Sequence, residues 1–169
     1  MRTAALLIAL LTALLYTHAS AAAPKVGARA PDFNLKDQFG KPWKLNDLAG
    51  RVTVLVAADT DSGRAMGPWV DALKNRYAGK VCILGLLDLH SVPGIGRGIA
   101  KSRIRKETKD PMMLDFSGAI ARAYGVSSKV PTVVVIDKGS VVRAVVSAAY
   151  DQKQCQTITS AVDKALEAK

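Results

Sequence analysis

The stretch that decides the fold runs from Val52 to Leu73 and reads VTVLVAADTDSGRAMGPWVDAL. Its first residues form an apolar, β-branched run of the kind that makes a buried strand. A polar loop follows, and Trp69, Val70 and Leu73 then recur at the spacing of one helix face. The order strand, loop, helix puts the loop at a helix N-terminus, where the helix dipole stabilises negative charge.

Further elements can be assigned on both sides of this unit. The patterning predicts strands at 33–35, 43–45, 52–58, 81–89, 112–115, 133–137 and 141–146, a helical turn at 46–49, and helices at 66–77, 99–108 and 117–124. A last amphipathic helix has Ile158, Val162 and Leu166 on its core face. Because a helix separates the two longest apolar runs, we expect them to be parallel strands. The fold class is α/β, with a central mixed sheet flanked by helices.

The first 21 residues have the pattern of a cleaved export signal. Arg2 precedes an apolar run from Ala4 to Tyr16 that is too short to span a membrane, and small residues follow at 19–21. Residues 22–169 are expected to form one domain. The mature protein is therefore predicted to be periplasmic or secreted.

The chain is basic, with a formal net charge of +10. This charge favours acidic partners such as acidic proteins or lipid headgroups, and export argues against nucleic acid. The candidate surface for an anionic partner comprises Arg97, Lys101, Arg105 and Lys109, the last three forming one stripe on the 99–108 helix. Its opposite apolar face is thin, which argues against stable membrane insertion. The simpler interpretation is a solvated helix face that aids solubility.

Several further segments resemble the redoxin branch of the thioredoxin-like superfamily. They are APDFNL at 30–35, DQFGKP at 37–42, LNDLAG at 45–50 and VPTVVVIDKG at 130–139. The branch includes TlpA-like thiol oxidoreductases and alkyl-hydroperoxide-reductase-like peroxiredoxins, and cysteine-poor periplasmic proteins of the YtfJ type resemble this chain more closely. The resemblance covers about Val26 to Leu166. It implies a thioredoxin-like fold with an N-terminal redoxin-type extension, an inserted helix and a cis bond before Pro131.

The reactive cysteines of that family are replaced in this chain. Counted from the strand, Gly63 and Met66 stand at the two cysteine positions of a C-x-x-C motif. Neither can form the thiolate that thiol–disulfide exchange requires. Ser62 has no identifiable base beside it, so Ser62 or Asp61 is expected to serve as the helix N-cap. No catalytic residue is assigned.

The same loop is expected to form one side of a binding groove. In the related family, the backbone beside the proline pairs with an extended substrate. The candidate groove comprises Thr60, Asp61, Ser62, Gly63, Arg64 and Met66, with Val130 and Pro131 opposite. The leading hypothesis is a binding or accessory module that holds a protein or extended peptide through backbone hydrogen bonds. A purely structural role for Pro131 is the alternative.

Other functions remain open. A thiol–disulfide oxidoreductase or peroxiredoxin-type enzyme could use Cys82 or Cys155, although their expected separation predicts two unpaired thiols, with Cys82 acting as a small buried apolar residue. An aspartate-based phosphotransferase on Asp59 and Asp61 lacks the later acidic pair of that class. A calcium loop over the same residues lacks its bidentate glutamate. No metal or cofactor is predicted.

Overall fold

Two β-sheets organise the chain, which the computed structural model describes over residues 23–127 and 129–168. Five strands form the main sheet in the order β5-β4-β3-β6-β7, and β1 and β2 form a separate antiparallel pair. Their bounds are β1 (Asn34–Lys36), β2 (Pro42–Lys44), β3 (Thr53–Asp59), β4 (Cys82–Asp88), β5 (Met112–Asp115), β6 (Thr132–Ile136) and β7 (Val142–Ser147). The expected export signal at 1–21 lies outside the described residues.

The main sheet is mixed, as the sequence predicts. β3 pairs in parallel with β4, and β4 with β5, whereas β6 and β7 are antiparallel to their neighbours. β3 is buried from Thr53 to Ala58 because helices or the N-terminal segment cover both faces of the sheet. The parallel arrangement brings the carboxyl ends of β3, β4 and β5 to one edge.

Four α-helices surround the sheet. They are α1 (Met66–Tyr77), α2 (Arg97–Glu107), α3 (Ala119–Ala123) and α4 (Gln152–Glu167), with short 3-10 turns at Leu45–Leu48, Gly63–Ala65 and Gly94–Gly96. α1 has the bounds that the sequence predicts. It ends where Ala78 and Gly79 both have positive φ, of 35° and 86°, a region that glycine tolerates better than other residues.

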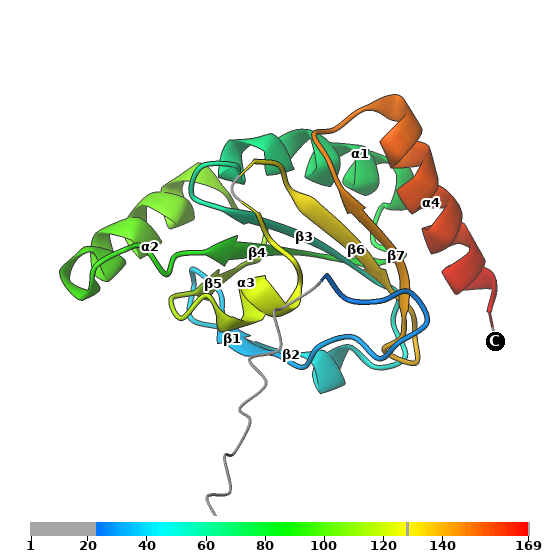
Figure 1. Cartoon of the computed structure of the whole chain (residues 1–169), viewed down its shortest axis with the longest axis horizontal. Coiled ribbons are helices and arrows are strands. Elements are labelled where there is room, and N and C mark those ends of the chain that lie inside the picture. The colour runs from blue at the N-terminus through cyan, green and yellow to red at the C-terminus, as the bar shows by residue number, and fades with distance from the viewer. Residues whose placement is uncertain (1–22, 128, 169) are drawn as a thin grey trace, which may run out of the picture.

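The helices form two layers with the sheet between them (Figure 1). α1 and α4 cover one face, where Trp69, Leu73, Ile158 and Val162 are fully buried in one cluster. On the other face, Tyr124, beside the C-terminus of α3, packs with residues of the N-terminal segment. Trp69 is therefore a core residue, as its helical spacing indicates.

The inserted helix α2 is held by the N-terminal extension. Gln38 is fully buried in the turn between β1 and β2. Its Nε2 donates to the carbonyl oxygens of Thr108 at 3.3 Å and Asp110 at 2.7 Å, and its Oε1 accepts from the backbone N–H of Met112 at 2.9 Å. The Arg105 guanidinium donates to the Gln38 carbonyl. These bonds fix the C-terminal end of α2 against the extension.

Within the described residues, no helix combines the length and apolar character needed to cross a membrane.

Candidate functional site

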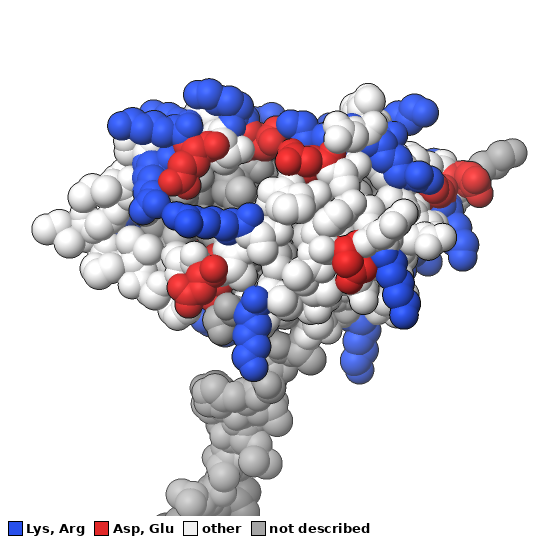
Figure 2. All heavy atoms as spheres, turned by 90° about the horizontal axis from the view of Figure 1, so that it is seen from above, with Lys and Arg blue, Asp and Glu red and all other residues white. Residues whose placement is uncertain are grey.

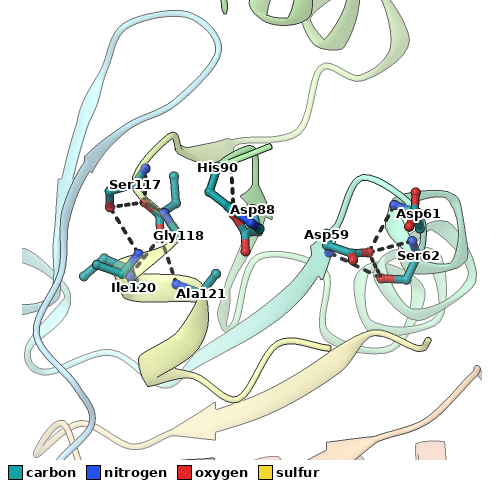
Figure 3. Close-up of polar contacts among 11 residues, drawn as sticks. Asp59, Asp61, Ser62, Asp88, His90, Ser117, Gly118, Ile120 and Ala121 are labelled. Atoms are coloured by element: carbon teal, nitrogen blue, oxygen red, sulfur yellow. Dashed lines mark hydrogen bonds and ion pairs between the residues drawn. The ribbon is translucent and has the colours of Figure 1, made fainter. Parts of the chain in front are cut away.

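The carboxyl edge of the three parallel strands carries one aspartate per strand. Asp59 is in register with Asp88, and Asp88 with Asp115. In open α/β sheets, ligands bind beside this edge, so the bonding of each carboxylate decides what the edge can do. Each of the three accepts hydrogen bonds from the loop that follows its own strand (Figure 3).

Asp59 organises the loop that enters α1. Its Oδ1 accepts from the backbone N–H of Asp61 at 3.1 Å and of Ser62 at 2.9 Å, and from the Ser62 hydroxyl at 2.7 Å. Ser62 is 5% exposed, so its hydroxyl is committed to this bond and is not a free nucleophile.

The predicted N-cap role of Ser62 or Asp61 is wrong. A 3-10 turn over Gly63–Ala65 precedes α1, and its backbone bond from Ala65 N–H to the Ser62 carbonyl takes the place of a side-chain cap. The N-cap residue of α1 is Ala65, and no side chain caps the helix. The Ser62 hydroxyl turns back to Asp59 instead.

Gly63 and Met66 lie where the sequence predicts, at the loop and the first residue of α1. Met66 is 2% exposed and belongs to the core cluster under α1. A Cβ atom on Gly63 would lie 3.3 Å from Cδ1 of Leu87, which is tight. The loop therefore packs closely against β4 and presents no reactive side chain at either position.

Val130 and Pro131 lie on the segment that leads into β6, whose Thr132 pairs with Ala57 of β3. Among the described residues no peptide bond is cis, so the expected cis bond before Pro131 is corrected to trans, the isomer that most X–Pro bonds adopt. Pro131 is buried, and its carbonyl accepts from the N–H of Ala148 at 3.1 Å. That acceptor is used within the fold because the segment continues into the pairing of β6 with β7.

A cavity of about 1310 Å³ lies on the other side of the loop, between α1 and α2. Five of the expected groove residues line it: Thr60, Asp61, Gly63, Arg64 and Met66. Its floor is formed by β4 and β5, and its apolar lining includes Val70, Ile83, Leu87, Ile99, Ile104 and Met112. Neither Val130 nor Pro131 contributes. Five loop residues of the candidate groove therefore open onto a cavity that the sequence does not predict.

Ion pairs border the cavity. Lys74 of α1 contacts Asp110 at 2.8 Å and so joins α1 to the loop before β5. The hydrogen bond to Asp110, and then its charge, raise the pKa of Lys74. Arg103 contacts Glu107 at 2.7 Å within α2. Figure 2, which views the molecule from the α1 side, shows lysine and arginine side chains gathered around a hollow beside α2.

The predicted basic stripe is wrong in part. α2 ends at Glu107, and Thr108 is extended, so Lys109 lies outside the helix. The Thr108 hydroxyl accepts from the N–H of Asp110 and closes the turn that ends the helix. Arg97 stacks over the Phe116 ring, 5.1 Å from its centroid, and Arg105 binds the Gln38 carbonyl. Of the four residues proposed, Lys101 alone remains on α2 without such a contact within the described residues.

A model of the AhpC/TSA family matches residues 26–145, which is more than half of the chain. This chain belongs to the AhpC/TSA family. An uncharacterised protein of Haemophilus influenzae is 25% identical over 138 residues, covering 76% of this chain and 74% of the relative. Because that relative is itself uncharacterised, it adds no function to the family assignment.

Solved structures agree with the fold of this AhpC/TSA-family protein. The exposed lipoprotein thioredoxin Etrx1 of Streptococcus pneumoniae is 22% identical, with a TM-score of 0.62, and the match covers 79% of this chain and 99% of that one. A thiol:disulfide interchange protein of Chlorobium tepidum is 19% identical, with a TM-score of 0.59, covering 85% and 99%. At these identities the likeness shows a thioredoxin-like fold.

The two thiols of this AhpC/TSA-family protein are free, and Cys82 lies at the opposite end of its strand from the α1 loop. Cys82 begins β4, six residues before Asp88, which is about 20 Å along a strand. It is 7% exposed, and burial raises the pKa of its thiol. Cys155 lies in the first turns of α4 and is half-buried. The prediction of two unpaired thiols, with Cys82 as a buried apolar residue, is confirmed.

Sequence reasoning missed Asp88 and His90. Oδ1 of Asp88 accepts from the His90 backbone N–H at 2.9 Å and lies 2.9 Å from His90 Nδ1 (Figure 3). Asp88 is 8% exposed, whereas the His90 side chain is mostly exposed. The pair stands on the loop after β4 and makes no recorded contact with Ser62. It fixes the ring orientation without providing a base for that hydroxyl.

Sequence reasoning also missed Asp115, which accepts more hydrogen bonds than Asp59 or Asp88. Its two oxygens accept from the Ser117 hydroxyl and from the N–H groups of Ser117, Gly118, Ile120 and Ala121. Burial alone would raise its pKa, but the hydrogen bonds from Ser117, Ala121 and Ile120 outweigh burial and hold the pKa below its ordinary value. The sequence does contain a signal, because all three parallel apolar runs end in aspartate.

No group of three or more histidine, cysteine, aspartate or glutamate side chains in residues 23–127 and 129–168 is placed to hold a metal ion.

Proposed function

We propose that this AhpC/TSA-family protein is an exported binding or accessory module that performs no thiol–disulfide or peroxidase chemistry of its own. The observation that carries the proposal is the pair Gly63 and Met66 at the N-terminus of α1. Thiol chemistry needs a thiolate at that position, where the helix dipole lowers the thiol pKa. Gly63 has no side chain, and Met66 is buried in the core.

No other described group supplies a substitute nucleophile there. The Ser62 hydroxyl donates to Asp59, and His90 is held by Asp88 on a different loop. Cys82 starts its strand at the opposite edge of the sheet, and burial disfavours its thiolate. The loop over 60–66 therefore acts as a surface and not as a reactive centre.

The cavity between α1 and α2 is the binding site in this proposal. Its floor strand β4 is paired on both sides, with β3 and β5, so no partner strand can add to it. A partner must instead insert side chains, and the apolar lining selects aliphatic or aromatic ones. Because the charged side chains that line the cavity are four basic and four acidic, apolar shape and not net charge selects the partner. We assign the occupant as an apolar segment of a protein partner.

Export is part of the proposal. The pattern of residues 1–21 supports it, as does the description of one structural neighbour as an exposed lipoprotein. The cavity is then available to partners outside the cytoplasm.

An activity assay tests the first half of the proposal. The purified protein is compared with its Cys82→Ser/Cys155→Ser variant for reduction of insulin disulfides and for consumption of hydrogen peroxide. We expect both proteins to give the rate of the buffer. A rate above buffer that the double variant loses would overturn the non-catalytic assignment.

A dye-binding assay tests the second half. The probe is 1-anilinonaphthalene-8-sulfonate, whose fluorescence rises in apolar sites. Val70 lies half-buried in the cavity wall, so Val70→Gln should lower the fluorescence gain several-fold. Val26→Ser changes an exposed aliphatic residue outside the cavity and serves as the matched control. Equal fluorescence for Val70→Gln and the unaltered protein would count against the cavity.

A further inference from the structure

The two most exposed large apolar side chains of the described residues stand together at the start of α2. Ile95 is 96% exposed and Ile99 is 75% exposed. A single exposed aliphatic side chain is ordinary, but two such neighbours form an apolar patch, which commonly marks a contact site. We name the segment Val92–Ala100 the α2 tip. Figure 1 shows that α2 reaches the edge of the molecule opposite α4.

The α2 tip presents almost no polar side chain. Its sequence is VPGIGRGIA, so three glycines and a proline separate the aliphatic residues. Arg97 is its one charged residue, and the guanidinium lies back over the Phe116 ring, 5.1 Å from the centroid. Ile95 therefore projects into water without a charged side chain next to it in the 3-10 turn.

A cationic belt lies directly behind the tip. From Ser91 to Lys106 the sequence holds five lysines and arginines and no aspartate or glutamate. Lys101 and Lys106 are the two of these that make no recorded ion pair within the described residues and are not stacked on a ring. The first acidic residue, Glu107, is already paired with Arg103. The apolar tip therefore comes first along the chain, and the cationic belt follows it on α2.

We propose that the α2 tip is a peripheral docking site for an anionic lipid bilayer. Ile95 and Ile99 enter the boundary between headgroups and acyl chains, and the exposed Lys106, two turns from Ile99 on the same helix face, contacts the lipid phosphates. Interfacial segments use this combination of buried aliphatic side chains and basic residues. A projecting tip enters a fluid surface directly, whereas a protein partner would need a pocket of matching shape. The contact is shallow and does not span the bilayer.

This site overlaps the mouth of the proposed binding cavity, because Val92, Gly96, Ile99 and Ala100 of the α2 tip also line the cavity, whereas Ile95 does not. Ile95→Ser therefore tests the tip without altering the cavity, and the dye assay above tests the cavity without altering the tip. Either proposal can fail alone.

The experiment is flotation of the full chain with lipid vesicles. One set contains phosphatidylcholine alone, and the other contains phosphatidylcholine and phosphatidylglycerol in equal parts. The variants are Ile95→Ser, Lys106→Glu, and two controls: Val26→Ser for an exposed aliphatic residue, and Lys153→Glu for an exposed lysine of α4. Every variant carries the same N-terminal segment, so differences between variants report the substituted residues.

We expect binding to the anionic vesicles only. Ile95→Ser should weaken it about tenfold, and Lys106→Glu at least about fivefold, while both controls bind as the unaltered protein does. The proposal is overturned if the chain does not bind, or if the α4 control loses as much affinity as the α2 variant. It is also overturned if Ile95→Ser abolishes self-association and leaves vesicle binding unchanged, which would assign the tip to a second copy.

Discussion

Oδ1 of Asp59 accepts both the hydroxyl hydrogen and the backbone N–H of Ser62, at 2.7 and 2.9 Å. Ser62 is the nucleophile-type side chain nearest the position where the related enzymes carry a cysteine, and it is used as a structural donor. The loop therefore keeps its shape through a carboxylate on the preceding strand. Its stability and its chemistry can be tested separately.

Removing the Asp59 carboxylate should loosen this loop. Asp59→Ala deletes an acceptor of three hydrogen bonds, and we expect the free energy of unfolding to fall by about 1–3 kcal/mol. Asp59→Asn is the matched variant, because an amide oxygen can still accept from the two backbone N–H groups, and it should cost less. Urea unfolding measures both. Equal costs would show that these bonds do not stabilise the loop.

The two thiols should react at very different rates. Cys155 is half-buried, whereas Cys82 is 7% exposed with a raised thiol pKa. With 5,5′-dithiobis(2-nitrobenzoic acid) at neutral pH, we expect one fast equivalent in the folded protein and the second only after unfolding. Cys155→Ser should remove the fast phase. If the Cys82→Ser variant loses the fast phase instead, the burial of the Cys82 thiol in β4 is contradicted.

Gln38 should control the order of α2. Gln38→Ala removes bonds to Thr108, Asp110 and Met112, and buried polar groups left without partners are costly. We expect faster amide hydrogen exchange over 97–112, with exchange in α1 unchanged as the internal control. Uniform acceleration across both helices would mean that the substitution weakens the whole fold and not the attachment of α2.

Acid should destabilise the protein partly through Asp115. The pKa of Asp115 is lowered in the folded state. Its contribution to the free energy of unfolding is therefore fully present above the pKa of the unfolded chain, about 3.9, and is lost as the pH falls through the pKa of the folded state. The stability difference between the unaltered protein and Asp115→Asn should therefore shrink as pH falls below about 4. Guanidinium unfolding from neutral to acidic pH checks this, and a constant difference would contradict it.

Asp137 offers an independent comparison for the acid experiment. Burial opposes its ionisation, but hydrogen bonds from Val141, Arg143 and Gly139 outweigh burial and also lower its pKa. Asp137 follows β6, which is antiparallel to β3, so it lies at the opposite end of the strands from Asp115. The effects of Asp137→Asn and Asp115→Asn on the free energy of unfolding should therefore add. Non-additive effects would show that the two edges are coupled.

Residue spacing within short segments predicted the helices and strands, whereas contacts between distant segments determine where the site residues lie. α1 is predicted to the residue because Trp69 and Leu73 mark one helix face and Gly79 ends it. Lys109 was wrongly placed on α2 because its spacing continues the basic pattern, while the Thr108–Asp110 turn interrupts the helix. Spacing alone contains no information about that turn.

The cavity could not be predicted because it depends on where α2 lies. That position follows from Gln38, which bonds to residues 70 to 74 positions later in the chain. The surroundings of Pro131 are set by tertiary contacts in the same way. Its resemblance to a family motif is local, but the use of its carbonyl by Ala148 is a tertiary contact.

The three in-register aspartates fasten each loop of the site at its own base. Asp59, Asp88 and Asp115 each bond to the loop that immediately follows their own strand, and none of their carboxylates bonds to a neighbouring loop in the described contacts. The loops after β4 and β5 are nevertheless tied through the backbone, because the Asp115 carbonyl accepts from the N–H of Leu89 at 2.9 Å. The loop after β3 makes no recorded bond to either of them, so it is the one that can be exchanged, by mutation or by grafting, with the least disturbance of the other two.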